Sequence, residues 1–120
     1  MLSRERREDM IIGALEGGSN YWYRLNDDKQ FWDMTKELKG DPLASRLAVS
    51  LLDKGMEMEI EDVETGEKLG TLSLASIEKG EQIMHDEYPH HYADAIKETD
   101  DADTADVWFQ LCVMGKLVYG

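Results

Sequence analysis

A strict alternation of apolar and acidic residues over residues 56–62, MEMEIED, constrains the fold of this chain more than any other feature. Successive side chains of a strand point to opposite faces, so the methionines and the isoleucine share one face and the glutamates share the other. The turn-like segment 64–67, ETGE, follows at once, and residues 68–72 return as a second strand. The pattern predicts an antiparallel hairpin with one buried face and one acidic face.

An aromatic-rich segment, residues 20–25 (NYWYRL), predicts a further strand. Glycines precede it and the turn-like residues 26–28, NDD, follow it, which is typical of a strand between two turns. In such a strand Tyr21, Tyr23 and Leu25 share one face.

Helical periodicity and capping residues account for most of the remaining sequence. Apolar residues recur there at spacings of three and four, which aligns them along one side of a helix. Each stretch opens with a capping residue or a proline. We expect helices that begin at Ser3, at Asp41-Pro42, at Ser73, at Pro89 and at Asp100–Asp103, of which the first ends at Gly17-Gly18, the second at Gly55 and the last at Gly115.

Two of these helices contain residues that oppose helix stability. Arg4, Arg6 and Arg7 stand in the first turn of the first helix, where positive charge opposes the helix dipole, and we expect them to be exposed. Gly80 lies within the third helix and weakens it by about 1 kcal/mol relative to alanine.

The last helix is the most apolar of the set. Trp108, Leu111 and Cys112 lie together, with Val107 and Met114 beside them, so this helix is apolar over most of its circumference. We expect it to be the central helix of the fold. Cys112 is the single cysteine of the chain, so it forms no intrachain disulfide, and we expect a buried thiol.

The chain length and the order of these elements predict one α+β domain. A chain of 120 residues is the usual size for a single hydrophobic core. No internal repeat, low-complexity tract or proline-rich linker divides it. We therefore expect residues 1–120 to form a small antiparallel sheet of about three strands packed with four or five helices.

The charge of the chain is concentrated in its second half. Residues 1–50 hold 8 basic and 9 acidic residues, whereas residues 51–120 hold 5 and 17, so of the net charge of −13 the halves carry −1 and −12. A strongly negative surface repels nucleic acid phosphate and attracts basic partners. We expect no direct binding of nucleic acid, and a protein partner with a basic surface.

Two stretches of the sequence resemble a known family. The stretches are ALEGGSNYW at residues 14–22 and DADTADVWFQL at residues 101–111, which runs on to Gly115 and Gly120, with KLGTL at residues 68–72 and IEKG at residues 77–80 between them. Together they are similar to a family of short uncharacterised proteins encoded by bacteriophages, prophages and other mobile elements. The resemblance spans most of the chain and implies a genomic setting, without an activity or site residues. Small acidic phage proteins often bind host or phage proteins, and some imitate the charge of DNA.

Two groups of residues are candidate binding surfaces. Glu57, Glu59 and Glu61 form the outer face of the 56–62 strand, where carboxylates either attract a basic partner or stand in for DNA phosphates. Trp22 and Trp32 belong to the densest aromatic group of the chain. They are natural anchors for a partner if one sheet face is open, and core residues if helices cover both faces.

The three histidines of the chain, His85, His90 and His91, lie close together in the sequence. His90 and Asp94 are four apart and share a helix face, so His85 could complete a metal site with them across the corner at Pro89. The spacing matches no established metal motif. We therefore expect no bound metal and no cofactor, and keep these residues as weak candidate ligands.

The sequence shows no motif that would indicate an enzyme. It has no phosphate-binding glycine loop, no nucleophile elbow, and no paired cysteine or helical histidine motif. We expect a non-enzymatic accessory protein of phage or mobile-element origin that binds another macromolecule. The alternatives are a DNA mimic that inhibits a host defence enzyme, and a small metal-dependent hydrolase built on the histidine cluster.

The N-terminal residues and the hydropathy pattern bear on localisation. The segment MLSRERR at residues 1–7 lacks the apolar stretch of a secretory signal, and no run of about 18 uncharged apolar residues follows. We expect a cytoplasmic protein that does not enter a membrane.

Overall fold

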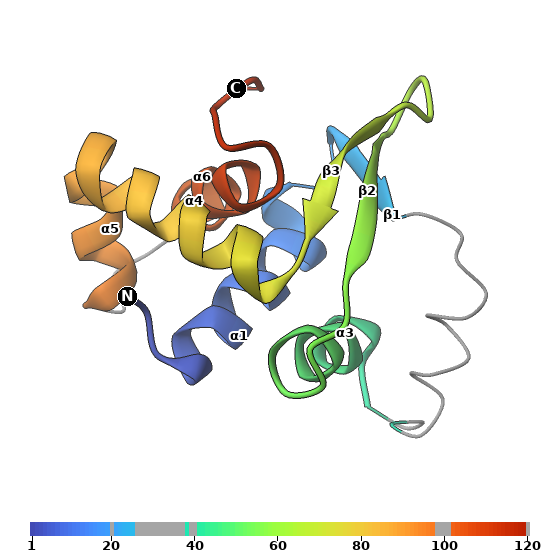
Figure 1. Cartoon of the computed structure of the whole chain (residues 1–120), viewed down its shortest axis with the longest axis horizontal. Helices are drawn as coiled ribbons and strands as arrows, with labels where there is room; N and C mark the ends of the chain where they lie inside the picture. The colour runs from blue at the N-terminus through green and yellow to red at the C-terminus, as the bar shows by residue number, and fades with distance from the viewer. Residues whose placement is uncertain (20, 26–37, 39–40, 98–101, 120) are drawn as a thin grey trace.

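The three strands stand together on one side of the molecule and most of the helices on the other, with α3 at the foot of β2 (Figure 1). The computed structural model describes residues 1–19, 21–25, 38, 41–97 and 102–119. Within these residues the chain forms five α-helices and a three-stranded antiparallel sheet, which confirms the expected α+β fold class. None of the helices in these ranges is long and apolar enough to cross a membrane.

The elements follow the order expected from the capping residues and the alternation. In chain order they are α1 (Arg4–Gly13), the π-helical turn η1 (Ala14–Gly18), β1 (Tyr23–Leu25), α3 (Leu43–Leu52), β2 (Met58–Asp62), β3 (Lys68–Leu72), α4 (Leu74–Glu87), α5 (Pro89–Ile96) and α6 (Ala102–Met114). Ser3 caps α1 by accepting a hydrogen bond from the backbone of Arg6, and Ser73 caps α4 in a reciprocal pair with Ser76. The expected cap at Asp41 is wrong, because α3 starts after Pro42 without a side-chain cap.

The sheet has the order β1-β2-β3, and both pairs are antiparallel. On β2, Met58 and Ile60 are buried while Glu59 is exposed, as the alternation predicts. Only Tyr23–Leu25 of the expected 20–25 strand pairs with β2. Tyr21 therefore lies in the turn before the strand and does not share the face of Tyr23.

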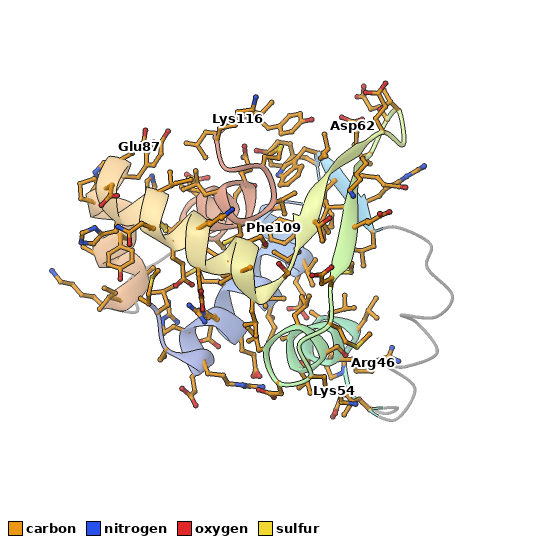
Figure 2. All side chains as sticks on the ribbon, in the orientation of Figure 1. Arg46, Lys54, Asp62, Glu87, Phe109 and Lys116 are labelled. Carbon is orange, nitrogen blue, oxygen red and sulfur yellow. The ribbon has the colours of Figure 1, made fainter. Side chains whose placement is uncertain are left out.

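Helix α6 is the central helix, as its composition predicts. It packs against α1, η1, β3, α4 and α5. Trp108, Leu111 and Cys112 are 0%, 1% and 2% exposed, and burial raises the pKa of the Cys112 thiol. Phe109 lies in the interior and contacts the rings of Trp22 and Tyr23 (Figure 2).

Two glycines let neighbouring backbones approach α6 closely. A methyl group added at Gly80 of α4 would lie 2.6 Å from the backbone nitrogen and Cα of Cys112. A methyl group added at Gly70 of β3 would collide with the carbonyl oxygen of Val113. Gly80 therefore lowers the helix propensity of α4, as expected from the sequence. It also allows the short distance between α4 and α6.

The arginines of α1 are not all exposed, which corrects the expectation from the sequence. The guanidinium of Arg7 donates from Nε and Nη2 to Glu81, with both distances 3.0 Å, and the Glu81 side chain is fully buried. Glu81 also accepts hydrogen bonds from the indole nitrogen of Trp108 and the backbone nitrogen of Leu2. Arg6 folds back to donate to the carbonyl oxygen of Ala95. A carboxylate inside the fold is costly unless a cation or hydrogen-bond donors compensate it, and at Glu81 the inward-turned Arg7 supplies both.

Replacement of Gly80 by alanine tests the close approach of α4 to α6. A methyl group favours a helix by about 1 kcal/mol, but the atoms that it meets at 2.6 Å are backbone and cannot rotate away. We expect Gly80→Ala to lower the free energy of unfolding by about 1–3 kcal/mol, the usual range for overpacking.

Gly17→Ala is the matched control, because no atom lies within 4 Å of the added methyl group, and its effect should stay within about 0.5 kcal/mol. Urea unfolding followed by circular dichroism measures both variants. A Gly80→Ala protein as stable as the parent would contradict the close approach.

Candidate functional site

A pocket of about 490 Å³ opens between α5, α6, the turn before β1 and the C-terminal tail. One wall is a single face of α6, because its lining residues there are spaced by three, four and seven. Exposed and buried polar groups face it together with apolar ones, which is typical of ligand and partner sites. The residues that line it are Tyr21, His91, Asp103, Asp106, Val107, Gln110, Leu117 and Tyr119.

The carboxylate of Asp106 forms the floor of this pocket and accepts four hydrogen bonds. Its Oδ1 accepts from the hydroxyl of Ser19 at 2.7 Å and from the indole nitrogen of Trp22 at 2.8 Å. Its Oδ2 accepts from the hydroxyl of Tyr21 at 2.6 Å and from the amide of Gln110 at 3.1 Å. Two bonds to each oxygen use the hydrogen-bonding capacity of a carboxylate fully.

Gln110 connects this carboxylate to the C-terminal tail. Its amide nitrogen donates to Asp106 and to the backbone carbonyl oxygen of Tyr119, both at 3.1 Å. Its amide oxygen accepts from the backbone nitrogens of Val118 and Tyr119, both at 3.0 Å. All four bonds of the side-chain amide are made, so α6 fixes the path of residues 118 and 119.

Tyr119 closes the network on its other side. Its ring stacks on the ring of Trp22, with centroids 5.2 Å apart and planes 11° apart. Its hydroxyl donates to Asp62 at the end of β2, and burial together with this bond raises the pKa of Tyr119. The tail, the hairpin and the turn before β1 therefore meet at one place.

Tyr21 stands at the rim of the pocket. Its side chain is 52% exposed, while its hydroxyl points to Asp106. Desolvation of the hydroxyl and the bond to Asp106 raise the pKa of Tyr21 to about 12. The phenol therefore stays protonated at neutral pH and acts as a hydrogen-bond donor.

The two carboxylates that are buried among the described residues differ in their counter-charge. Glu81 has the guanidinium of Arg7 at 3.0 Å. All four donors of Asp106 are neutral groups, and no Lys, Arg or His side chain in the described part of the chain pairs with it. His91 lines the same pocket, but its Nδ1 lies 3.2 Å from the hydroxyl of Thr104. The pocket therefore has an uncompensated negative charge at its floor.

The structure corrects the expected aromatic surface. Trp22 is 1% exposed and bonded to Asp106, so its side chain belongs to the core and cannot anchor a partner. The physical reason is the late start of β1, which places Trp22 in the preceding turn and directs it inward. Trp32, the other candidate anchor, lies outside the described residues. Tyr21 is the aromatic residue that this region exposes.

The expected acidic face of the sheet carries compensating cations. Glu57 precedes β2 and is exposed. Glu59 lies 3.3 Å from the ammonium group of Lys68, and Glu61 lies 3.1 Å from the guanidinium of Arg24. The outer face of the sheet therefore mixes both signs of charge, because each neighbouring strand places one cation beside β2.

The histidines do not converge on a site. His85 contacts Asp86 at 2.9 Å and packs edge-on against Tyr92. The rings of His90 and His91 are 5.0 Å apart. No group of three or more His, Cys, Asp or Glu side chains that could hold a metal ion occurs among the residues that the structure describes. The weak candidate ligands His85, His90, His91 and Asp94 therefore form no such group in the described structure.

The sequence contains a signal for this pocket that belongs to no established motif. Asp106 and Gln110 are polar, four residues apart, and lie within the most apolar helix of the chain, a position where a polar pair needs partners. Those partners come from Ser19, Tyr21 and Trp22. They belong to the first of the two stretches on which the family resemblance rests, and Asp106 belongs to the second.

Comparisons with known proteins assign no family to this chain. No protein-family model, curated protein or solved structure shows significant similarity to it. The geometry of the described residues therefore carries the functional proposal.

Replacement of Asp106 by asparagine tests the role of its carboxylate in the fold. Either orientation of the new amide directs its NH₂ group at an N–H donor, that of Trp22 or that of Gln110, which then lacks an acceptor. We expect Asp106→Asn to lower the free energy of unfolding by about 2 kcal/mol or more.

Asp103→Asn makes the same charge change on the same face of α6 at an exposed position, and should cost less than about 1 kcal/mol. Thermal and urea unfolding compare the two variants. Equal losses of stability would mean that the four hydrogen bonds add nothing beyond the charge.

Proposed function

We propose that this protein acts without catalysis, by binding another macromolecule that presents a basic surface. One observation carries the proposal. A set of exposed carboxylates has no cation within ion-pair distance anywhere in the described ranges. These carboxylates are Glu57, Glu64, Glu67, Glu78 and Glu87, on the hairpin and on α4.

The placement of these carboxylates supports attraction of a partner. β3 runs directly into α4, so the carboxylates of the hairpin and those of α4 lie on consecutive elements of the chain. Figure 2 shows Asp62 at the hairpin and Glu87 at the far end of α4. Near α1 part of the acidic charge is compensated, since Asp9 pairs with Arg6 and Asp53 with Arg4. Unpaired like charges along one side of a protein steer an oppositely charged partner toward that side.

The state of the reactive side chains supports binding rather than catalysis. Cys112 is buried and its pKa is raised, which disfavours the nucleophilic thiolate. The raised pKa of Tyr21 keeps its hydroxyl protonated. Asp106 already accepts four hydrogen bonds and is a poor general base.

The narrower predictions made from the sequence each rest on a different observation. A phage or mobile-element origin rests on the resemblance alone, and action in the cytoplasm rests on the buried free thiol. A DNA mimic needs a row of unpaired carboxylates, but Glu59 and Glu61 on β2 face Lys68 and Arg24. We therefore propose the broader function, with a basic protein surface as the partner.

Charge neutralisation tests this proposal. The immobilised protein is used to capture proteins from a bacterial lysate, and the association rate of each captured protein is then measured at several salt concentrations. We expect a partner of basic composition whose association slows as salt screens charges beyond about 8–10 Å. Glu64→Gln combined with Glu67→Gln should slow association about threefold or more at low salt.

Glu5→Gln combined with Glu16→Gln is the matched control, with the same change in net charge at exposed positions of α1 and η1. It should have a clearly smaller effect. A partner without a basic patch, or an association rate that is indifferent to salt and to both double variants, would refute the proposed function.

A further inference from the structure

Resting on the proposed function, we propose that the pocket at Asp106 receives an arginine side chain of the basic partner. Among the described residues, the buried carboxylates Glu81 and Asp106 differ in whether a cation compensates them. Glu81 is matched by Arg7 from the same chain. Asp106 is 9% exposed and has only neutral donors within the described residues. A negative charge in surroundings of low dielectric gains more from a nearby cation than an exposed charge does.

A second carboxylate gives that cation a hydrogen-bond partner. The four bonds of Asp106 leave it no further lone pair, so it contributes charge to the pocket rather than a contact. Asp103 lies one turn earlier on the same face of α6, is exposed, and lines the pocket. No cation of the described segments pairs with Asp103, so both of its oxygens are open to a guanidinium.

No cation of the described chain occupies this place. Lys116 stands near the pocket in sequence, but it does not line the pocket and makes no ion pair with the described residues. Figure 2 shows it on the tail beyond α6. His91 is the one basic side chain in the lining, and its contact is with Thr104. The described part of the chain therefore leaves this place open to a cation of the partner.

The remaining lining favours arginine over lysine. Val107 and Leu117 supply apolar surface, and Tyr21 and Tyr119 supply aromatic rings. A guanidinium is planar and weakly hydrated, so its faces tolerate apolar and aromatic contacts while its edge bonds to a carboxylate. An ammonium group is compact and strongly hydrated and gains less from such a lining. Tyr21 and Leu117, which are 52% and 36% exposed, supply surface around the opening for the rest of the partner.

Trp22 and Trp108, the tryptophans that the structure describes, report on this pocket within one spectrum. The indole N–H of Trp22 donates to Asp106, and that of Trp108 donates to Glu81. A short, uncharged-ended peptide with two arginines separated by glycine is titrated into ¹⁵N-labelled protein, beside the same peptide with lysines. We expect the Trp22 indole signal to move until saturation while the Trp108 signal stays in place. The lysine peptide should bind about fivefold more weakly or worse.

Two charge-matched variants locate the binding. Asp103→Asn should raise the Kd of the arginine peptide about five- to tenfold, since it removes a charge-assisted bond. Glu78→Gln, at an exposed position of α4, should raise it less than about twofold. Retention of the folded spectrum in both variants shows that stability is not the cause.

Three results would contradict the proposal that this pocket binds arginine. The first is no movement of the Trp22 signal at millimolar arginine peptide, and the second is equal binding of the arginine and lysine peptides. The third is equal loss of affinity in Asp103→Asn and Glu78→Gln. The last two would leave attraction to basic partners in place, so the pocket can fail while the proposed function stands.

Discussion

Two buried carboxylates fix the position of the central helix. A carboxylate away from water is tolerated only when donors satisfy it, and both of these hydrogen-bond networks include residues of α6. Asp106 belongs to this helix, and Trp108, two residues later, bonds to Glu81 of α4. Two residues correspond to about 200° around a helix, so the two networks hold α6 from opposite sides. Through Arg7, Glu81 also attaches α1, and through Ser19 and Tyr21, Asp106 attaches the segment before β1.

Glycines determine how near the neighbours of α6 come once hydrogen bonds have oriented it. The backbones of α4 and β3 approach this helix at Gly80 and Gly70, where any side chain would meet backbone atoms of Cys112 and Val113. Close backbone packing excludes water from the nearby polar groups, which strengthens their hydrogen bonds. The charge networks and the close contacts therefore support one another, and α6 is the element that combines them.

Much of the fold could be predicted from the sequence, because periodicity reports which face of an element is apolar. The hairpin around Gly66 and the burial of Trp108 follow from patterns within a few residues. The pairing of Arg7 with Glu81 joins residues 74 positions apart, and no local pattern indicates it. The sequence left open whether Trp22 lies in the core or on a partner surface, and the start of β1 decides between the two. A strand that starts three residues later than expected leaves this side chain in a turn, where alternation does not apply. Tyr21 is then the exposed aromatic residue of this segment, and it lines the candidate site.

The side chain of Gln110 pairs with the peptide group of Tyr119 as one strand pairs with another. Its amide donates to the backbone carbonyl and accepts from the backbone nitrogen of the same residue. Because Gln110 contacts only main-chain atoms of the tail, this attachment tolerates any side chain except that of proline at residues 118 and 119. Position 110 of α6, by contrast, requires glutamine. Glutamate has no N–H to donate, and asparagine is one methylene shorter. Substitution could therefore reshape the outer surface of the tail at Val118 while the tail stays joined to α6.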